Sequence, residues 1–216
     1  GVEGVNENSY TLWSIKDAQK IKQHIIEIFE EAKVTKDTEY RNNLLTFVVC
    51  GGGFTGVEMI GELIEWIDDL CQKYQISKEA IQLQLCEGLE EILPNLNKKL
   101  TENALEYLLN NNVKVKTGSF VTKIKENKLI LNSEEIIKSH TIIWTCGVQA
   151  STLTTNTDLK TDDSGKIIVN KYLQTQNHPE VYAVGDIAAV PYKEGQNIPA
   201  LVEAAMQTGE CAAINV

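Results

Sequence analysis

Residues Leu44–Glu58 have the sequence LLTFVVCGGGFTGVE, in which an apolar run meets three consecutive glycines. The run Leu44–Cys50 is β-prone and almost free of polar side chains, which is typical of a strand buried on both faces of a parallel sheet. After the glycines, apolar residues recur at three- and four-residue steps from Val57 to Tyr74, as on one face of an amphipathic helix. The stretch therefore predicts a strand, a glycine loop and a helix in direct succession.

The glycine loop has the spacing G-x-G-x-x-G at Gly51, Gly53 and Gly56. The first glycine permits a tight turn, the second lets the backbone approach a diphosphate, and the third lets the helix pack closely on the strand. At the helix N-terminus, residues Phe54 to Val57 would offer free N–H groups and the positive end of the helix dipole. Because the motif lies between a strand and a helix, we expect a dinucleotide diphosphate to bind here. The alternative is a glycine-rich turn without a ligand.

The next predicted strand, Ile81–Cys86, ends at Glu87. A carboxylate in this place can accept hydrogen bonds from both ribose hydroxyls of an adenosine, and it would repel a 2′-phosphate. Glu87 therefore favours NADH over NADPH. The alternative is a solvated carboxylate at a strand end.

Two further positions lie where a bound dinucleotide would extend. Glu58 follows the loop, in what we expect to be the first helical turn. Its carboxylate either favours the helix N-terminus, by under ~1 kcal/mol, or lies near the nicotinamide, and the spacing leaves both open. Gly147, Val148 and Gln149 follow the apolar strand Thr141–Thr145, so they are candidates for the crevice at the carboxyl ends of the strands, with an ordinary turn as the alternative.

The surrounding sequence predicts the rest of an α/β unit. Ser14–Lys33 is amphipathic, with Ser14 and Asp17 spaced for a capping box, and Lys36–Asn43 is polar and indicates a linker. Further elements are expected at Asn97–Asn111, Val113–Lys116, Phe120–Lys125, Lys128–Leu131 and Thr141–Thr145. This order predicts an α/β, Rossmann-like domain, with a parallel sheet and a β-meander in its crossover.

The remaining tail has a second glycine and acid pair. Val181–Val184 predicts a buried strand that ends at Gly185-Asp186, where the glycine allows a ligand to approach and the carboxylate can accept from sugar-like hydroxyls. The alternative for this segment is an ordinary turn. A short strand at Ile167–Val169 and a helix over Ala200–Val216 complete the tail. We expect the tail to pack with Gly1–Lys33 as a second domain.

Composition excludes several classes of function. The net charge is −10, which argues against nucleic-acid binding, since that needs clusters of Lys and Arg. The five cysteines contain no C-x-x-C pair and lack zinc spacing with the three histidines, so we expect reduced thiols and no metal site. No apolar run is long enough to span a bilayer.

Five segments together resemble type II NADH dehydrogenases, which are single-subunit flavoproteins with two dinucleotide-binding domains. They are Leu44–Glu58, the Glu87 strand end, Ile143–Gln149 (IWTCGVQ), Val181–Ala188 (VYAVGDIA) and Ile198–Gly209 (IPALVEAAMQTG). The resemblance implies an NADH-binding domain over residues 41–150, inserted into a partial FAD-binding domain formed by residues 1–40 and 151–216. It also implies that NADH passes a hydride to FAD and that the electrons then reduce a quinone, either menaquinone or ubiquinone.

The resemblance also assigns roles to single residues. Gly185 and Asp186 match the pair that holds the ribitol and phosphate region of FAD, and Glu58 matches a glutamate near the nicotinamide and the quinone. Glu203 stands where the family's quinone site has a glutamine, and Gln207 matches its second glutamine.

The family's first FAD-binding glycine loop and its C-terminal membrane-binding region have no counterpart in this sequence. We therefore expect the chain by itself to be inactive, and the full-length protein to be cytoplasmic and peripheral on the inner face of the membrane. Two alternatives stay open for the function: a related NAD(P)H–flavin reductase with a non-quinone acceptor, and a non-catalytic NADH-binding module. The oligomeric state is also open, with a homodimer as one alternative.

Overall fold

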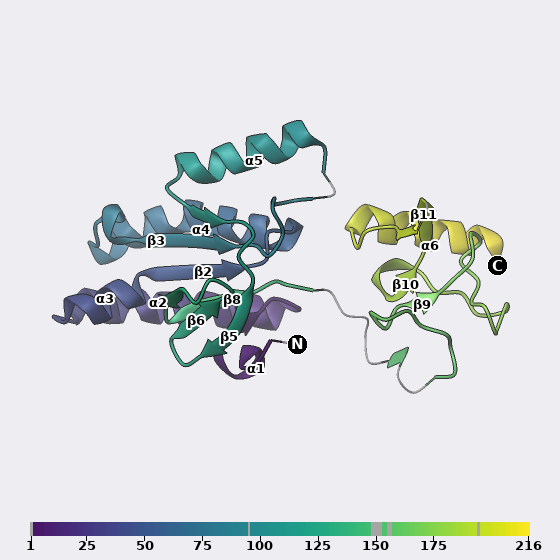
Figure 1. Ribbon diagram of the computed structural model, residues 1–216, viewed down its shortest axis with the longest axis horizontal. Helices are drawn as coiled ribbons and strands as arrows, with labels where there is room; N and C mark the ends of the chain where they lie inside the picture. The colour runs from purple at the N-terminus through teal and green to yellow at the C-terminus, as the bar shows by residue number, and fades with distance from the viewer. Residues whose placement is uncertain (1, 95, 148–152, 155–156, 194) are drawn as a thin grey trace. The chain divides into compact units, whose positions relative to one another are not determined.

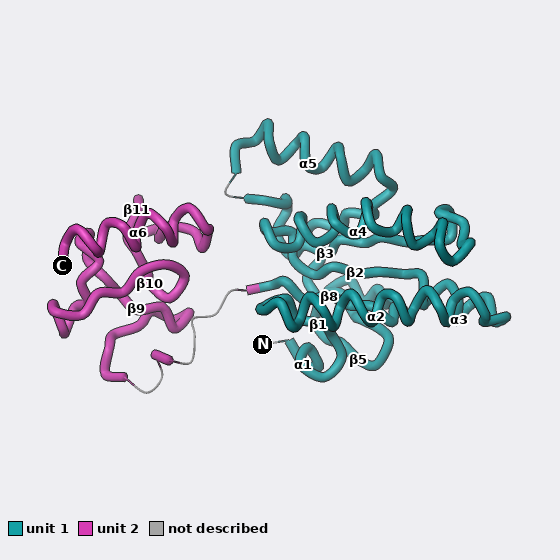
Figure 2. The backbone as a smooth tube through the Cα atoms, turned by 180° about the vertical axis from the view of Figure 1, so that it is seen from behind, with its two compact units in different colours: residues 1–146 teal, residues 147–216 magenta. Residues whose placement is uncertain are grey.

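The computed structural model describes residues 2–94, 96–147, 153–154, 157–193 and 195–216. The chain forms two compact units, Gly1–Cys146 (unit 1) and Gly147–Val216 (unit 2), as Figure 2 shows. Val148 and Gln149, which the sequence placed in the crevice, lie outside the described residues.

A five-stranded parallel sheet forms the centre of unit 1 (Figure 1). Its order is β1-β8-β2-β3-β4, and each neighbouring pair is parallel. The strands are β1 (Tyr10–Thr11), β2 (Thr46–Cys50), β3 (Gln82–Cys86), β4 (Lys114–Lys116) and β8 (Thr141–Trp144). The predicted Rossmann-like parallel sheet is confirmed, and β1 is an additional edge strand that the sequence did not indicate.

Each face of the sheet is covered, and this explains why every residue of β2 is buried. Phe47 and Val49 belong to a core shared with the helices α2 (Ile15–Val34), α4 (Phe54–Tyr74) and α5 (Lys98–Asn110). The alternate residues Val48 and Cys50 belong to a second core with β5 (Val121–Lys125), β6 (Lys128–Leu131) and β7 (Ile136–Lys138). In this antiparallel sheet, β5 and β6 correspond to two strands of the predicted β-meander and β7 is additional. The third predicted strand, Val113–Lys116, was expected in the same insert but pairs in parallel with β3 as β4.

Helix α2 begins as the sequence predicts. The Ser14 hydroxyl accepts from the Asp17 N–H at 3.2 Å and donates to the Asp17 carboxylate at 2.9 Å. The buried face of α2 consists of Ile21, Ile25, Ile28, Phe29 and Ala32, and the Phe29 ring lies 6.0 Å from the Phe47 ring between centroids. This apolar face belongs to the same core as β2 and α4, and the packing of Gly1–Lys33 with the tail stays a prediction.

The predicted linker Lys36–Asn43 is also a helix, α3 (Thr38–Leu44). The Asp37 carboxylate accepts from the Tyr40 N–H at 3.0 Å and so caps the helix. Arg41 Nε donates to the Ala32 carbonyl at 2.9 Å, and Leu44 is fully buried. Local capping and one buried leucine therefore order a segment whose composition is polar. A one-turn helix, α1 (Val5–Asn8), and a 3₁₀ turn, η1 (Lys78–Ala80), complete the helices described in unit 1.

Unit 2 is built from short elements. Strands β9 (Ile167–Ile168) and β10 (Ala188–Ala189) pair in parallel, and β11 (Pro191–Lys193) pairs antiparallel with β12 (Gln196–Asn197). Helix α6 (Val202–Asn215) confirms the predicted C-terminal helix. The core of unit 2 consists of small and medium apolar side chains: Ile167, Val169, Leu173, Ala183, Ala188, Val190 and Ala212.

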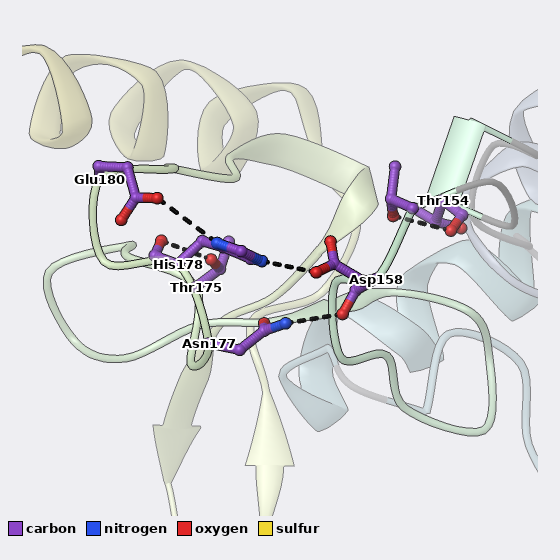
Figure 3. Close-up of polar contacts among 7 residues, drawn as sticks. Thr154, Asp158, Thr175, Asn177, His178 and Glu180 are labelled. Atoms are coloured by element: carbon purple, nitrogen blue, oxygen red, sulfur yellow. Dashed lines mark hydrogen bonds and ion pairs between the residues drawn. The ribbon is translucent and has the colours of Figure 1, made fainter.

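The predicted strand Val181–Val184 is reduced to one antiparallel β-bridge, between Tyr182 and Gln174. Its backbone bonds run from the Ala183 N–H to the Leu173 carbonyl at 3.1 Å and from the Thr175 N–H to the Val181 carbonyl at 2.9 Å, and they join the turns that end at Leu173 and Val181. A polar cluster holds the same turns together (Figure 3). There the His178 ring lies 2.8 Å from Asp158 and 3.4 Å from Glu180, measured from nitrogen to carboxylate oxygen.

Candidate functional site

The glycine loop begins where three parallel strands end side by side. Cys50 at the end of β2 is in register with Cys86 of β3 and Trp144 of β8. Gly51 follows with φ of 111°, a conformation that side chains disfavour, and its N–H donates to the Cys86 carbonyl at 2.8 Å. The first glycine thus makes the turn that the motif predicts.

Gly56 is needed for a different reason. It lies in the first turn of α4, where an added Cβ would be 1.8 Å from the Gly51 carbonyl oxygen and 2.8 Å from Thr145 Oγ1. No side chain fits at that distance, so the helix reaches the end of β2 only because residue 56 is glycine. The predicted role of the third glycine, close packing of helix on strand, matches this geometry.

The second glycine leaves space at the start of α4. Gly53 is the N-cap, and a Cβ added there would meet no atom within 4 Å. The first backbone bond of the helix runs from the Val57 N–H to the Gly53 carbonyl at 3.0 Å, so the expectation that Val57 also offers a free N–H was wrong. The N–H groups of Phe54, Thr55 and Gly56 therefore have no acceptor within the helix, and they lie at the positive end of its dipole. This arrangement can hold a diphosphate without a basic side chain.

Glu87 follows β3, and both of its carboxylate oxygens are fixed by backbone donors. Oε2 accepts from the Gly52 N–H at 2.5 Å, and Oε1 accepts from the Leu89 N–H at 2.7 Å. A carboxylate has about four lone-pair positions, so each oxygen keeps capacity for another donor, such as a ribose hydroxyl. Glu87 is thus bonded to the glycine loop itself, which the sequence could not show.

A cavity of about 330 Å³ adjoins Glu87 at this edge of the sheet. Its lining includes Cys86, Phe120, Trp144 and Cys146. Its volume is at the lower end of the range for small-molecule sites. Glu87, which lines the cavity, also bonds to Gly52 of the glycine loop, so the cavity lies next to the loop.

The thiols in this cavity are not suited to nucleophilic or redox chemistry. Burial raises the pKa of Cys86 to about 12. Cys146 is exposed as a residue, but its sulfur lies against Gly51, and burial together with the charge of Glu87 raises its pKa to about 12. Both thiols are therefore protonated near neutral pH. All five cysteines of the chain are free.

Glu58 lies in the second turn of α4, because the helix begins at Phe54. The expectation of a first-turn position was therefore wrong, and the interpretation as a carboxylate favouring the helix dipole loses most of its force, since the effect falls off beyond that turn. The side chain is exposed and lines a groove of about 730 Å³ between α2 and α4, together with Thr55 and Trp66. The groove is otherwise mainly apolar.

Gly147 follows β8 with φ of 82°, and an added Cβ would meet no atom within 4 Å. It is exposed at the first position of unit 2. Its left-handed conformation suits a turn, which is the alternative that the sequence left open.

The second glycine and acid pair lies in unit 2. Gly185 begins the 3₁₀ turn η3 (Gly185–Ile187) with φ of 67°, and its N–H donates to Thr208 Oγ1 at 3.0 Å. Asp186 is exposed. The described residues around the pair enclose only about 10 Å³. These residues alone therefore do not form a site that fits FAD.

Glu203 and Gln207 lie one turn apart on α6, so they share a face of the helix. Both are exposed, and Met206 between them is 62% exposed. Glu58 belongs to unit 1 and this pair to unit 2, so the three predicted catalytic residues do not meet within either unit.

One functional candidate, Thr145, was missed by the sequence analysis. Its hydroxyl donates toward the Cys50 carbonyl at 2.8 Å and the Gly51 carbonyl at 3.3 Å. The two partners lie 95 and 94 residues away in the chain, and no motif spacing connects them. Only the pairing of β2 with β8 brings them together.

Other kinds of site find no support in the part of the chain that the structure describes. It contains no group of three or more His, Cys, Asp or Glu side chains placed to hold a metal ion. Among the same residues, no helix combines the length and apolar character needed to cross a bilayer.

Comparison with known proteins gives matches along almost the whole chain. A probable NADH dehydrogenase of Dictyostelium discoideum is 32% identical over 211 residues, which cover 96% of this chain and 46% of that protein. A type II NADH:quinone oxidoreductase of Staphylococcus saprophyticus is 27% identical, covering 100% of this chain and 54% of that protein. The chain therefore spans about half the length of these relatives.

Solved structures show the same fold. The structure of NDH2 from Plasmodium falciparum in complex with NADH matches with a TM-score of 0.79 at 23% identity, covering 88% of this chain and 41% of that one. The predicted resemblance to type II NADH dehydrogenases is confirmed by the names of these relatives. The model of the pyridine nucleotide-disulphide oxidoreductase family matches residues 1–209, so the chain belongs to that family.

Proposed function

We propose that unit 1 binds NADH across the carboxyl ends of β2, β3 and β8. The diphosphate would be held by the N–H groups of Phe54, Thr55 and Gly56, and the adenosine would lie in the cavity beside Glu87. The single observation that carries this proposal is the hydrogen bond between Glu87 and Gly52, because it joins the ribose-binding carboxylate to the diphosphate-binding loop.

The same carboxylate would select NADH over NADPH. A 2′-phosphate placed at the adenosine ribose would bring its charge against Glu87. The protein's net charge of −10 adds to this repulsion, and the described cavity residues include no lysine or arginine to offset it. NADPH should therefore bind more weakly by at least about tenfold.

The relatives are about twice as long as this chain. For a protein of that length that includes this chain, we propose the activity that the relatives' names indicate. NADH would give a hydride to FAD, and the electrons would reduce a quinone. Unit 1 would be the NADH-binding part, and unit 2, with Gly185 and Asp186, would contribute to the FAD-binding part. Glu203 and Gln207 would belong to the quinone site, and contact with a membrane surface would be peripheral.

Calorimetric titration of the chain with NADH and with NADPH tests the binding proposal. The wild type should bind NADH more tightly than NADPH. Glu87→Ala should weaken NADH binding by about tenfold, the scale of a hydrogen bond to a charged group, and should reduce the difference between the two cofactors. Glu91→Ala is a matched control, since Glu91 is an exposed carboxylate in the same loop. Equal affinity of the wild type for both cofactors would remove Glu87 from its proposed role.

A further inference from the structure

Thr145 contacts the glycine loop from the side opposite Glu87. Gly51 is flanked by two peptide groups, Cys50–Gly51 and Gly51–Gly52. The Thr145 hydroxyl lies 2.8 Å from the carbonyl oxygen of the first and 3.3 Å from that of the second. The Thr145 N–H also donates to the Cys50 carbonyl at 2.9 Å. Thr145 therefore holds the carbonyl ends of both peptide groups.

The N–H ends of the same two peptide groups are held by the β3 side. The Gly51 N–H donates to the Cys86 carbonyl at 2.8 Å, and the Gly52 N–H donates to Glu87 Oε2 at 2.5 Å. In a trans peptide group the C=O and N–H point in opposite directions, so fixing one end fixes the other. The Gly51–Gly52 peptide group is thus fixed by Thr145 at its oxygen and presented to Glu87 at its nitrogen.

The loop needs these hydrogen bonds because its glycines have no side chains whose packing could fix the backbone. Gly51 has φ of 111° and glycine has many other accessible conformations. Thr145 Oγ1 also lies 2.7 Å from the position that a Cβ on Gly51 would take and 2.8 Å from that of a Cβ on Gly56. The hydroxyl therefore packs against both the loop and the first turn of α4.

We infer that Thr145 is a positioning residue for NADH: its hydroxyl sets the plane of the Gly51–Gly52 peptide group, and through it the Glu87 carboxylate that contacts the adenosine ribose. This inference rests on the proposed function of unit 1. It differs from a general role in stability, because loss of the hydroxyl should affect the cofactor that depends on Glu87 more than the cofactor that Glu87 repels.

The test is calorimetric titration of NADH and NADPH with Thr145→Val, which keeps the shape and removes the hydroxyl, and with Thr145→Ser, which keeps the hydroxyl. Thr145→Val should weaken NADH binding by roughly five- to tenfold, as for loss of one hydrogen bond, and the preference for NADH over NADPH should fall by at least about twofold. Thr145→Ser should restore both values to near the wild type.

Thr46→Val is the matched control. Thr46 lies at the other end of β2, and its hydroxyl donates to the Asn42 carbonyl at 2.8 Å, the same distance as in the Thr145–Cys50 bond. It should leave NADH affinity and the cofactor preference unchanged. If Thr145→Val does not fold, Thr145→Ala and Thr145→Ser can be compared instead, because these two differ only in the hydroxyl.

The outcomes separate this inference from the proposed function. Wild-type protein that fails to bind NADH would overturn the proposed function and this inference with it. Wild-type protein that binds NADH, with an unchanged affinity in Thr145→Val, would overturn this inference alone. Equal weakening of NADH and NADPH would also overturn it, because Thr145 would then act on stability and not through Glu87.

Discussion

The two units each carry a glycine and an acidic residue at a predicted strand end, and they differ in what surrounds this pair. In unit 1, three neighbouring strands end together, Glu87 is bonded to the glycine loop, and a cavity of about 330 Å³ adjoins it. In unit 2, Gly185 and Asp186 lie in a 3₁₀ turn beside about 10 Å³ of space. The same kind of motif therefore borders a sizeable cavity only in the unit where neighbouring strands end beside it.

The largest expected effect tests whether the two units unfold independently of each other. Phe29→Ala removes a fully buried ring that contacts both Phe47 and Tyr74, so it should lower the free energy of unfolding of unit 1 by about 3–5 kcal/mol. All three tryptophans, Trp13, Trp66 and Trp144, lie in unit 1, so their fluorescence during denaturation reports on that unit.

Amide hydrogen exchange would report on unit 2 in the same variant. Protection of α6 should not change in Phe29→Ala. The control is Tyr107→Ala, at a residue that is 45% exposed. It should leave the free energy of unfolding of unit 1 within about 0.5 kcal/mol of the wild type. A parallel loss of protection in both units would show that they unfold as one body.

The next largest effect concerns the glycine loop. Gly56→Ala would place a methyl group 1.8 Å from the Gly51 carbonyl, so α4 must move away from β2. We expect a loss of about 1–3 kcal/mol in unfolding free energy and NADH binding weakened by about 100-fold or more, measured by denaturation and calorimetry.

Gly61→Ala is the control for this change. A Cβ at Gly61, in the same helix, would meet no atom within 4 Å. Alanine should therefore stabilise the helix by about 0.5–1 kcal/mol and leave NADH binding intact. If both variants bound NADH equally well, close packing at Gly56 would not be required for the site.

The two units should also respond to pH in opposite directions. In unit 2, the Asp158 carboxylate, aided by Glu180, raises the pKa of His178 above its usual 6.5. The stabilising contribution is complete below pH 6.5 and is lost as the pH rises through the higher pKa of the folded state. In unit 1, burial lowers the pKa of His24, against the opposite effect of its hydrogen bond to the His140 carbonyl. Its contribution is lost as the pH falls below 6.5.

Hydrogen exchange corrected for the intrinsic rate at each pH can measure this difference. Between pH 6 and pH 8, residues 175–181 should lose protection in the wild type and not in His178→Gln. Residues 20–28 should lose protection on acidification in the wild type and less so in His24→Gln. The same trend in both units would contradict the assigned environments of the two histidines.

The smallest effect on NADH binding is expected at Asp186. Asp186→Asn removes a charge from the pair in unit 2, which lies outside the proposed NADH site. NADH affinity should change by less than about twofold, and the purified chain should carry no FAD absorbance in either form. Weaker NADH binding in Asp186→Asn would mean that unit 2 contributes to the site.

Much of unit 1 could be predicted because its signals are local. The glycines, the apolar strand before them and the amphipathic helix after them each depend on neighbours in the sequence, and the Ser14 cap depends on a residue three positions away. Glu87 was predicted as a strand-end carboxylate, but its bond to Gly52 was not, because that bond depends on the register of β2 and β3.

The errors have a common physical cause. Strand β1 has two residues and β7 has three, so pairing in space and not sequence pattern makes them strands. Val181–Val184 has a strand-like sequence, but its pairing is limited to one β-bridge between Tyr182 and Gln174. For α2, the amphipathic pattern shows that a face is buried and not which surface buries it, which in unit 1 is the core around β2 and α4.

The most direct test is a crystal structure of the chain with NADH. The diphosphate should lie within hydrogen-bonding distance of the Phe54, Thr55 and Gly56 amides, and both adenosine ribose hydroxyls should contact Glu87. NADH bound at another surface, with protein side chains occupying the space beside the loop Gly51–Gly56, would contradict the account.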